Sequence, residues 1–109
     1  MEINTRRFGK WFIIAVCGKF VLKNITDIRM FFESNESNLW IAVDLKKTTL
    51  LDSSALTILT NFHKRLQNKG GKLVIFEPDK YIADVFSIVG FDHLISIYYT
   101  EEEFCKFCE

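Results

Sequence analysis

Two adjacent serines, Ser53 and Ser54, are the residues of this chain best placed to do chemistry. They follow Asp52 and precede an amphipathic segment, so we expect them in the first turn of a helix. Unpaired backbone amides and a partial positive charge at such a turn favour an attached phosphate group. The sequence therefore predicts a modifiable site. Plain helix capping, for which Ser and Asp are favoured residue types, is the alternative interpretation.

A serine hydrolase is the enzyme that would use the same hydroxyl groups. The chain lacks a GxSxG turn, and a nucleophilic serine needs a base within hydrogen-bond reach. His63 lies roughly two and a half turns beyond Ser54 on the predicted helix, which is too far. His93 has no evident carboxylate to orient it. We therefore expect a non-catalytic protein.

Three cysteines offer other chemistry. Cys105 and Cys108 form a CxxC sequence, but a zinc site has four ligands, and the chain has no second cysteine pair or histidine cluster. Cys17 lies in an apolar segment and is expected to be a small core residue. An odd number of cysteines without a disulfide framework fits a reducing compartment. We expect no metal and no other cofactor.

The 109 residues have the size and composition of one ordinary domain, which we assign to residues 1–109. The 14 basic and 14 acidic side chains balance, which argues against binding to nucleic acid or to an anionic membrane. No apolar run reaches the roughly 18 residues of a membrane span. Arg6-Arg7 and the apolar run Trp11–Cys17 lack the cleavage pattern of a signal peptide. We expect a cytoplasmic monomer or weak dimer.

Strands and helices alternate along the chain and must together position the serines. Gly9-Lys10 predicts a hairpin turn, and Gly18 is expected to end the second strand. The predicted strands are Glu2–Phe8, Trp11–Cys17, Leu39–Leu45, Leu73–Phe76 and about Leu94–Ile97. The predicted helices are Asn24–Glu33, Ser53–Asn68, one from Pro78-Asp79 to Gly90, and one from Thr100. This order predicts an α/β fold: a mixed, mostly parallel sheet of about five strands with an N-terminal hairpin, covered by about four helices.

The link Lys46–Leu51 is expected to lead from the carboxyl end of a central strand to Asp52. Function in such sheets is usually placed at the carboxyl ends of strands. Beyond the serines, one side of the helix is apolar and is expected to face the core; it comprises Ala55, Ile58 or Leu59, Phe62 and Leu66. The predicted topology and the two serine hydroxyl groups therefore indicate the same site, at the start of the helix that follows Asp52.

With these elements in this order, the chain resembles the STAS domain family, of the anti-sigma factor antagonist (anti-anti-sigma factor) type. The resemblance covers nearly the whole chain and rests on four stretches: Val43–Leu45, the DSSAL motif Asp52–Leu56, Gly70-Gly71 before a strand, and Val85–Phe91 before the last strand. It implies a small sheet with helices packed mainly on one side.

The resemblance also implies a bacterial signalling protein that regulates transcription through protein–protein interaction. In that system the unphosphorylated protein binds an anti-sigma factor that is a serine kinase of the ATPase fold. The kinase phosphorylates the second serine of the DSS motif, and a PP2C-type phosphatase removes the phosphate. The matching residue is Ser54, with Ser53 as second choice. The partner-binding residues implied here are Asp52, Ser53, Ser54, Ala55 and Thr57.

Two positions depart from the family pattern. Ala55 stands where many members have Gly, and Val21 stands where phosphorylated members often have Asp. Val21 favours an alternative: a constitutive STAS-type subunit of a membrane-associated complex such as a lipid-transport ATPase. A nucleotide-binding sensor is a third hypothesis, although Lys69–Lys72 lacks the spacing of a phosphate-binding loop.

Overall fold

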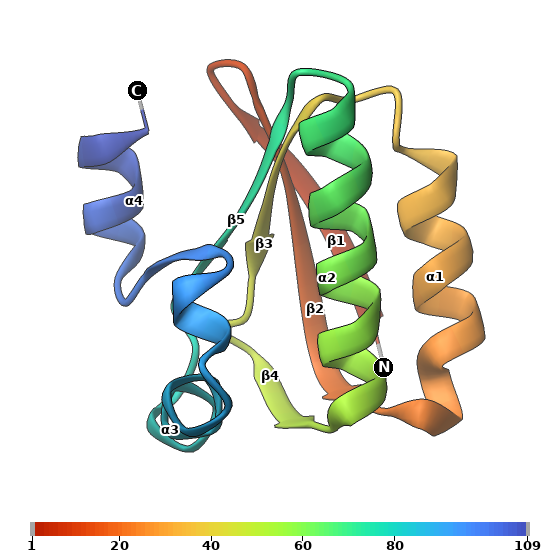
Figure 1. The fold of residues 1–109 in the computed structure, drawn as a ribbon, viewed down its shortest axis with the longest axis vertical. Helices are drawn as coiled ribbons and strands as arrows, with labels where there is room; N and C mark the ends of the chain where they lie inside the picture. Colours follow the sequence, from red (N-terminus) through yellow and green to blue (C-terminus); the bar gives the residue numbers. More distant parts are fainter. Residues whose placement is uncertain (1, 109) are drawn as a thin grey trace.

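The computed structural model of the chain describes residues 2–108, which form one mixed sheet with helices on both of its faces (Figure 1). The strands in this part of the chain are β1 (Glu2–Phe8), β2 (Trp11–Phe20), β3 (Trp40–Asp44), β4 (Thr48–Leu51), β5 (Lys72–Phe76) and β6 (Ser96–Tyr98). The helices are α1 (Ile25–Ser34), α2 (Ser53–Asn68), α3 (Lys80–Val89) and α4 (Glu101–Phe107), with short 3-10 helices η1 (Leu22–Asn24) and η2 (Phe91–His93).

The sheet follows the order β1-β2-β3-β5-β6, and β4 pairs with the end of β2. β1 and β2 form an antiparallel hairpin, while the other neighbouring strands are parallel. Helices cross between the parallel strands, as chain connectivity in such sheets requires. The predicted α/β fold, with its hairpin and mostly parallel sheet, is confirmed.

The larger part of the core lies between the sheet and helices α1 and α2, which run side by side over one face (Figure 1). Phe32 of α1 and Phe62 of α2 meet there, with ring centroids 5.1 Å apart. The apolar side predicted for α2 is buried; it comprises Ala55, Ile58, Leu59, Phe62 and Leu66. Burial of this stripe fixes the rotation of α2 and hence the direction of its first turn.

Helix α4 covers part of the opposite face of the sheet. Phe104 stacks on Phe76, with ring centroids 4.6 Å apart, and also contacts Trp11 edge to face. The indole nitrogen of Trp11 donates a hydrogen bond of 2.7 Å to the carbonyl oxygen of Cys108. The sheet is therefore covered mainly, but not only, on the α1–α2 side.

Two predicted boundaries were wrong in a way that matters for the site. β2 does not end at Gly18 but continues to Phe20, because Gly18 adopts φ 104° where the pairing register shifts, and its N–H bonds to Lys47 O at 2.9 Å. The link Lys46–Leu51 is not all loop, since its second half is β4. The sheet consequently gains a sixth strand within the described residues.

Three smaller differences concern the flanks. The first helical segment opens with η1 before α1. The last strand is Ser96–Tyr98, because the N–H groups of Leu94 and Ile95 bond back to Phe91 O in the turn after η2. Cys17 is only half-buried, and its sulfur accepts a hydrogen bond from the Asn4 side chain at 3.7 Å, so it is not a core residue. The predicted cap at Gly90 is confirmed, with φ 75° and a bond from its N–H to Phe86 O.

The backbone of the turn after α2 lies close to the residue that precedes β3. Gly70 adopts φ 83°, which glycine tolerates without cost. A Cβ atom on Gly71 would lie only 2.0 Å from the carbonyl oxygen of Leu39. The Gly70-Gly71 pair therefore permits a close approach of two backbones.

Candidate functional site

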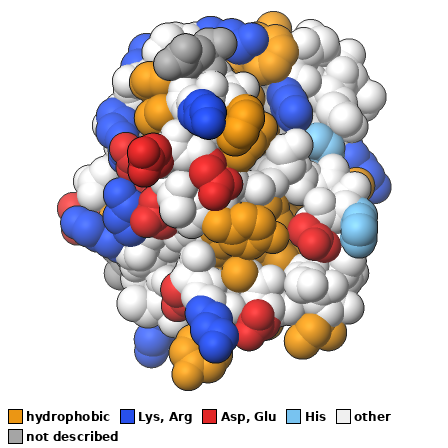
Figure 2. Space-filling view, turned by 90° about the vertical axis from the view of Figure 1, so that its left-hand side faces the viewer, with side chains coloured by type: hydrophobic (Ala, Val, Ile, Leu, Met, Phe, Trp, Pro, Cys, Tyr) orange, Lys and Arg blue, Asp and Glu red, His pale blue; other side chains and the backbone are white. Residues whose placement is uncertain are grey.

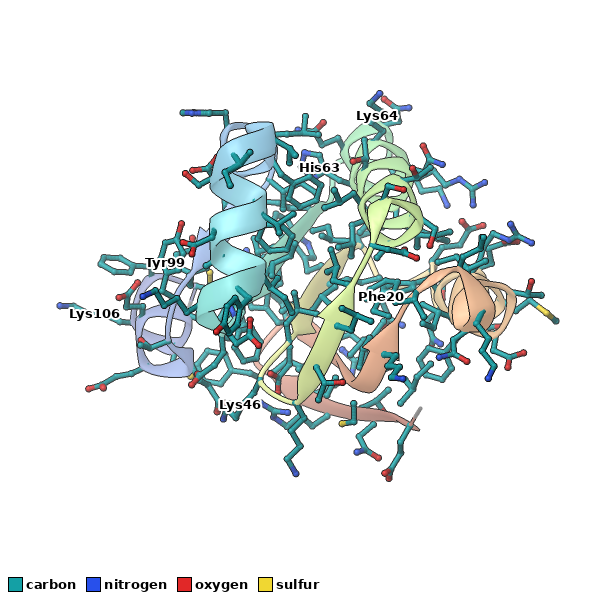
Figure 3. All side chains as sticks on the ribbon, turned by 90° about the horizontal axis from the view of Figure 1, so that it is seen from below. Phe20, Lys46, His63, Lys64, Tyr99 and Lys106 are labelled. Carbon is teal, nitrogen blue, oxygen red and sulfur yellow. The ribbon has the colours of Figure 1, made fainter. Side chains whose placement is uncertain are left out.

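Strand β4 places the start of α2 beside the end of β2. Thr48 is buried, and its hydroxyl donates a bond of 2.6 Å to the carbonyl oxygen of Val16. β4 then runs alongside Lys19 and Phe20, as seen from below in Figure 3. The N–H of Asp52 reaches the carbonyl oxygen of Phe20 at 3.4 Å. Asp52 is thus fixed next to the chain that leaves β2.

The carboxylate of Asp52 joins two segments of the chain. Its Oδ1 accepts bonds from the Ser54 N–H at 3.0 Å, from the Ala55 N–H at 3.4 Å and from the Ser54 hydroxyl. Its Oδ2 accepts a bond from the Leu22 N–H at 2.9 Å. The prediction that Asp52 is the N-cap of α2 is confirmed, and the same side chain also ties α2 to the start of η1.

These hydrogen bonds lower the pKa of Asp52 below the ordinary value of 3.8. The bond from the Ser54 hydroxyl is the largest cause, followed by the bond from the Leu22 N–H. A carboxylate that accepts several donors is stabilised in its charged form. Asp52 is therefore a fixed negative charge beside Ser54 at neutral pH.

The two serines differ in what their hydroxyl groups do. Ser54 is half-buried, and its hydroxyl points back to Asp52. Ser53 is exposed, and its carbonyl oxygen accepts a bond of 3.1 Å from the hydroxyl of Thr57. Both serines lie in the first turn of a long helix, as the sequence predicts. Only Ser54 is linked through its side chain to Asp52.

The other predicted positions lie around this turn. Thr57 is exposed one turn further along α2, whereas the side chain of Ala55 is fully buried under the helix. Ala55 therefore supports the first turn rather than facing a partner. Val21 is half-buried in extended backbone, directly before the Leu22 N–H that Asp52 binds. The site thus has no second carboxylate at position 21.

Exposed apolar side chains lie on three elements at this end of the molecule (Figure 1). Leu22 of η1 is 69% exposed, Leu50 of β4 is 51% exposed, and Tyr81 of α3 is 81% exposed. A shallow groove of about 100 Å³ runs between β4 and α3, lined by Thr49, Leu50, Leu51, Tyr81, Ile82 and Val85. Leu50 and Tyr81 thus share one groove, and a contiguous exposed apolar surface is typical of interaction sites.

Sequence reasoning did not find this surface, because the apolar residues Ile82, Val85, Phe86 and Val89 of α3 do not by themselves show which of them are covered. Only Ile82 and Phe86 are buried. Figure 2 shows apolar side chains among charged ones on the side of the molecule that carries α3 and α4. The sequence did carry a signal: apolar residues of α3 occur on more than one of its sides, whereas a helix with one covered face needs them on that face alone.

The described residues do not place a general base or a metal site at the serines. His63 is buried on α2, and burial is the largest cause of its lowered pKa. Within residues 2–108, no group of three or more His, Cys, Asp or Glu side chains is arranged to hold a metal ion. Nor does any described helix have the length and apolar character of a membrane span.

The fold and this site agree with a match to a protein family. The model of the STAS domain family matches residues 2–104 of the chain. The chain therefore belongs to the STAS domain family. No curated protein gives a significant sequence match.

Solved structures show the same fold at low sequence identity. A candidate anti-sigma factor antagonist from Thermotoga maritima aligns with a TM-score of 0.88 and 19% identity, over 95% of this chain and 92% of that one. Phosphorylated SpoIIAA from Bacillus aligns with a TM-score of 0.72 and 16% identity, over 99% and 100%. The mouse anion transporter Slc26a9 aligns with a TM-score of 0.68 and 11% identity, over 84% of this chain and 16% of the transporter. These likenesses establish the fold.

Proposed function

We propose that this chain is a non-catalytic regulatory binding protein of the anti-sigma factor antagonist type, switched by phosphorylation of Ser54. The observation that carries the proposal is the hydrogen bond between the Ser54 hydroxyl and the Asp52 carboxylate, at an end of the molecule where apolar side chains are exposed. The structural likeness to anti-sigma factor antagonists supports it. The proposed setting is the cytoplasm.

In the unphosphorylated form, the proposed partner is an anti-sigma factor that is also a serine kinase of the ATPase fold. It would contact Asp52, Ser53, Ser54 and Thr57, together with the neighbouring apolar side chains Leu22, Leu50 and Tyr81. Burial of a large apolar side chain contributes up to about 1.5–3 kcal/mol. These three apolar side chains supply affinity, and the neutral Ser54 hydroxyl makes the contact sensitive to modification.

Phosphorylation of Ser54 would add about −1.5 to −2 charges directly beside Asp52. The modified side chain can no longer donate its hydroxyl hydrogen to Asp52, so the first turn loses one bond of its cap. The amides at the start of α2 partly compensate the added charge on the helix itself. A partner surface built for a neutral hydroxyl is repelled, and a PP2C-type phosphatase would restore binding.

Affinity capture from the native cell tests the proposal, using wild type, Ser54→Ala and Ser54→Asp as baits. Wild type and Ser54→Ala should retain a serine kinase of the ATPase fold, whereas Ser54→Asp should lose it. Ser53→Asp tests the second-choice serine, which lies in the same helix turn but has no side-chain bond to Asp52. Retention of the kinase by Ser54→Asp, together with its loss by Ser53→Asp, contradicts the assignment to Ser54.

A constitutive STAS-type subunit of a membrane-associated complex, such as a lipid-transport ATPase, is the second candidate. Two observations favour it: the apolar Val21 beside the site, and the occurrence of the fold within an anion transporter. Under this alternative the start of α2 makes a permanent contact. Equal recovery of a membrane ATPase by wild type, Ser54→Ala and Ser54→Asp would support it and overturn the switch.

A further inference from the structure

Cys105 and Cys108 lie three residues apart at the end of α4, on the opposite face of the sheet from α2. Cys108 is buried and Cys105 is half-buried, and both pack against the cluster that contains Trp11, Phe76 and Phe104. Residues three apart in a helix have Cα atoms about 5 Å apart. That separation lies within the range of disulfide-bonded cysteines. The two cysteines thus lie close together at the end of α4, against the same cluster.

Cys108 is held at the helix end by two backbone hydrogen bonds. Its N–H bonds to Phe104 O at 2.9 Å, and its carbonyl oxygen accepts the indole N–H of Trp11 at 2.7 Å. Its side chain also faces Tyr98: interaction with Cys108, together with burial, raises the pKa of Tyr98 to about 12. The backbone of Cys108, at φ −115° and ψ 20°, has already left the helix. Its side chain can therefore be reoriented without unwinding a helical turn.

We propose that Cys105 and Cys108 form a redox modification site: a dithiol that a low-molecular-weight disulfide, such as oxidised glutathione, converts into an intramolecular disulfide. The more accessible Cys105 thiolate attacks one sulfur of the small disulfide, giving a mixed disulfide and releasing one thiol. The Cys108 thiolate then attacks the Cys105 sulfur and releases the second thiol. Two protein thiols are oxidised, one small disulfide is reduced, and the two protons pass to the released thiolates.

Closure of this disulfide alters how α4 covers the sheet. The side chain of Cys108 turns toward Cys105, and the last turn of α4 shifts the carbonyl oxygen that binds Trp11. The environment of the Trp11 indole therefore changes with the redox state. The serine site on α2 lies on the other face, so this modification is separate from the proposed switch at Ser54.

Intact-mass analysis of the whole chain tests the proposal without any variant. The protein is equilibrated in mixtures of reduced and oxidised glutathione, alkylated, weighed and mapped by peptide analysis. The expected product is a monomer with one alkyl group, on Cys17, and a mass two hydrogen atoms below that of a singly alkylated reduced chain. It carries a Cys105–Cys108 bond that dithiothreitol reduces. Tryptophan fluorescence should change over the same range of mixtures.

Variants assign the reaction to the pair. Cys17→Ser should keep both the mass change and the fluorescence change, whereas Cys105→Ser and Cys108→Ser should each lose them. In wild type, three alkylated thiols at the most oxidising mixture, a lasting glutathione adduct, a covalent dimer or a bond that includes Cys17 would each overturn the proposal. The wild-type measurement alone tests the proposal, so an unstable variant would not change the conclusion.

Discussion

Replacement of Asp52 by alanine should destabilise the fold more than the loss of an ordinary helix cap. The variant loses the bonds to the first turn of α2 and the bond from the Leu22 N–H. A helix cap contributes about 1 kcal/mol, and a further hydrogen bond to a charged group contributes about 1 kcal/mol at a partly exposed site. We therefore expect Asp52→Ala to lower the free energy of unfolding by about 2 kcal/mol at neutral pH.

Asp79→Ala is the matched control. Asp79 caps α3 through a single bond from the Ile82 N–H at 2.8 Å, within its own helix. Its replacement should cost about 1 kcal/mol. Asp52→Asn should lower the free energy of unfolding by less than either alanine variant, because asparagine is also a favoured capping residue and keeps an acceptor oxygen.

Urea unfolding followed by circular dichroism measures these differences, and amide hydrogen exchange at Leu22 tests their cause. Exchange at Leu22 should accelerate in Asp52→Ala and stay unchanged in Asp79→Ala. Because the pKa of Asp52 is lowered in the folded state, its contribution is complete above the unfolded value of about 3.8 and is lost as the pH falls through the folded value. Equal costs for Asp52→Ala and Asp79→Ala, with unchanged exchange at Leu22, would refute the link between α2 and η1.

Two further predictions concern α2 and its end. Burial lowers the pKa of His63, so the unfolded state binds a proton more readily, and stability should decline as the pH falls below about 6.5. His63→Gln should flatten that decline in pH-dependent urea unfolding. An unchanged slope in this variant would show that His63 does not cause the decline. Gly71→Ala should cost at least about 2 kcal/mol because its Cβ would meet the Leu39 carbonyl. Gly70→Ala, which meets open space but keeps φ 83°, should cost about 1 kcal/mol; a thermal melt that ranks Gly70→Ala as the more damaging would show that backbone strain outweighs the clash.

Much of the fold follows from local sequence patterns. The apolar spacing of Ala55, Phe62 and Leu66 predicts which side of α2 is buried, and Asp52 predicts where the helix begins. Both signals lie within one element and depend on helix geometry alone. The same holds for Gly90, whose lack of a Cβ suits the left-handed cap of α3.

The features that sequence reasoning missed depend on contacts between distant segments. β4 has only four residues and exists because it pairs with the end of β2. The bond from the Leu22 N–H to Asp52 joins positions 30 residues apart, so no local pattern reports it. The exposure of Val85 likewise depends on which side of α3 the sheet leaves uncovered. The position of the two serines at the start of α2 was therefore predictable, but the link from Asp52 to Leu22 and the exposed apolar side chains nearby were not.

A phosphate on Ser54 is proposed to control partner binding, and the affinity of the captured kinase for two forms of the chain measures that control. One form is unphosphorylated, and the other carries a single phosphate on Ser54, verified by peptide mapping. The dissociation constant should rise about tenfold or more on phosphorylation, a loss of about 1.4 kcal/mol or more, while Ser54→Ala should bind like the unphosphorylated chain. Equal affinity of the two forms would show that the phosphate does not act as a switch.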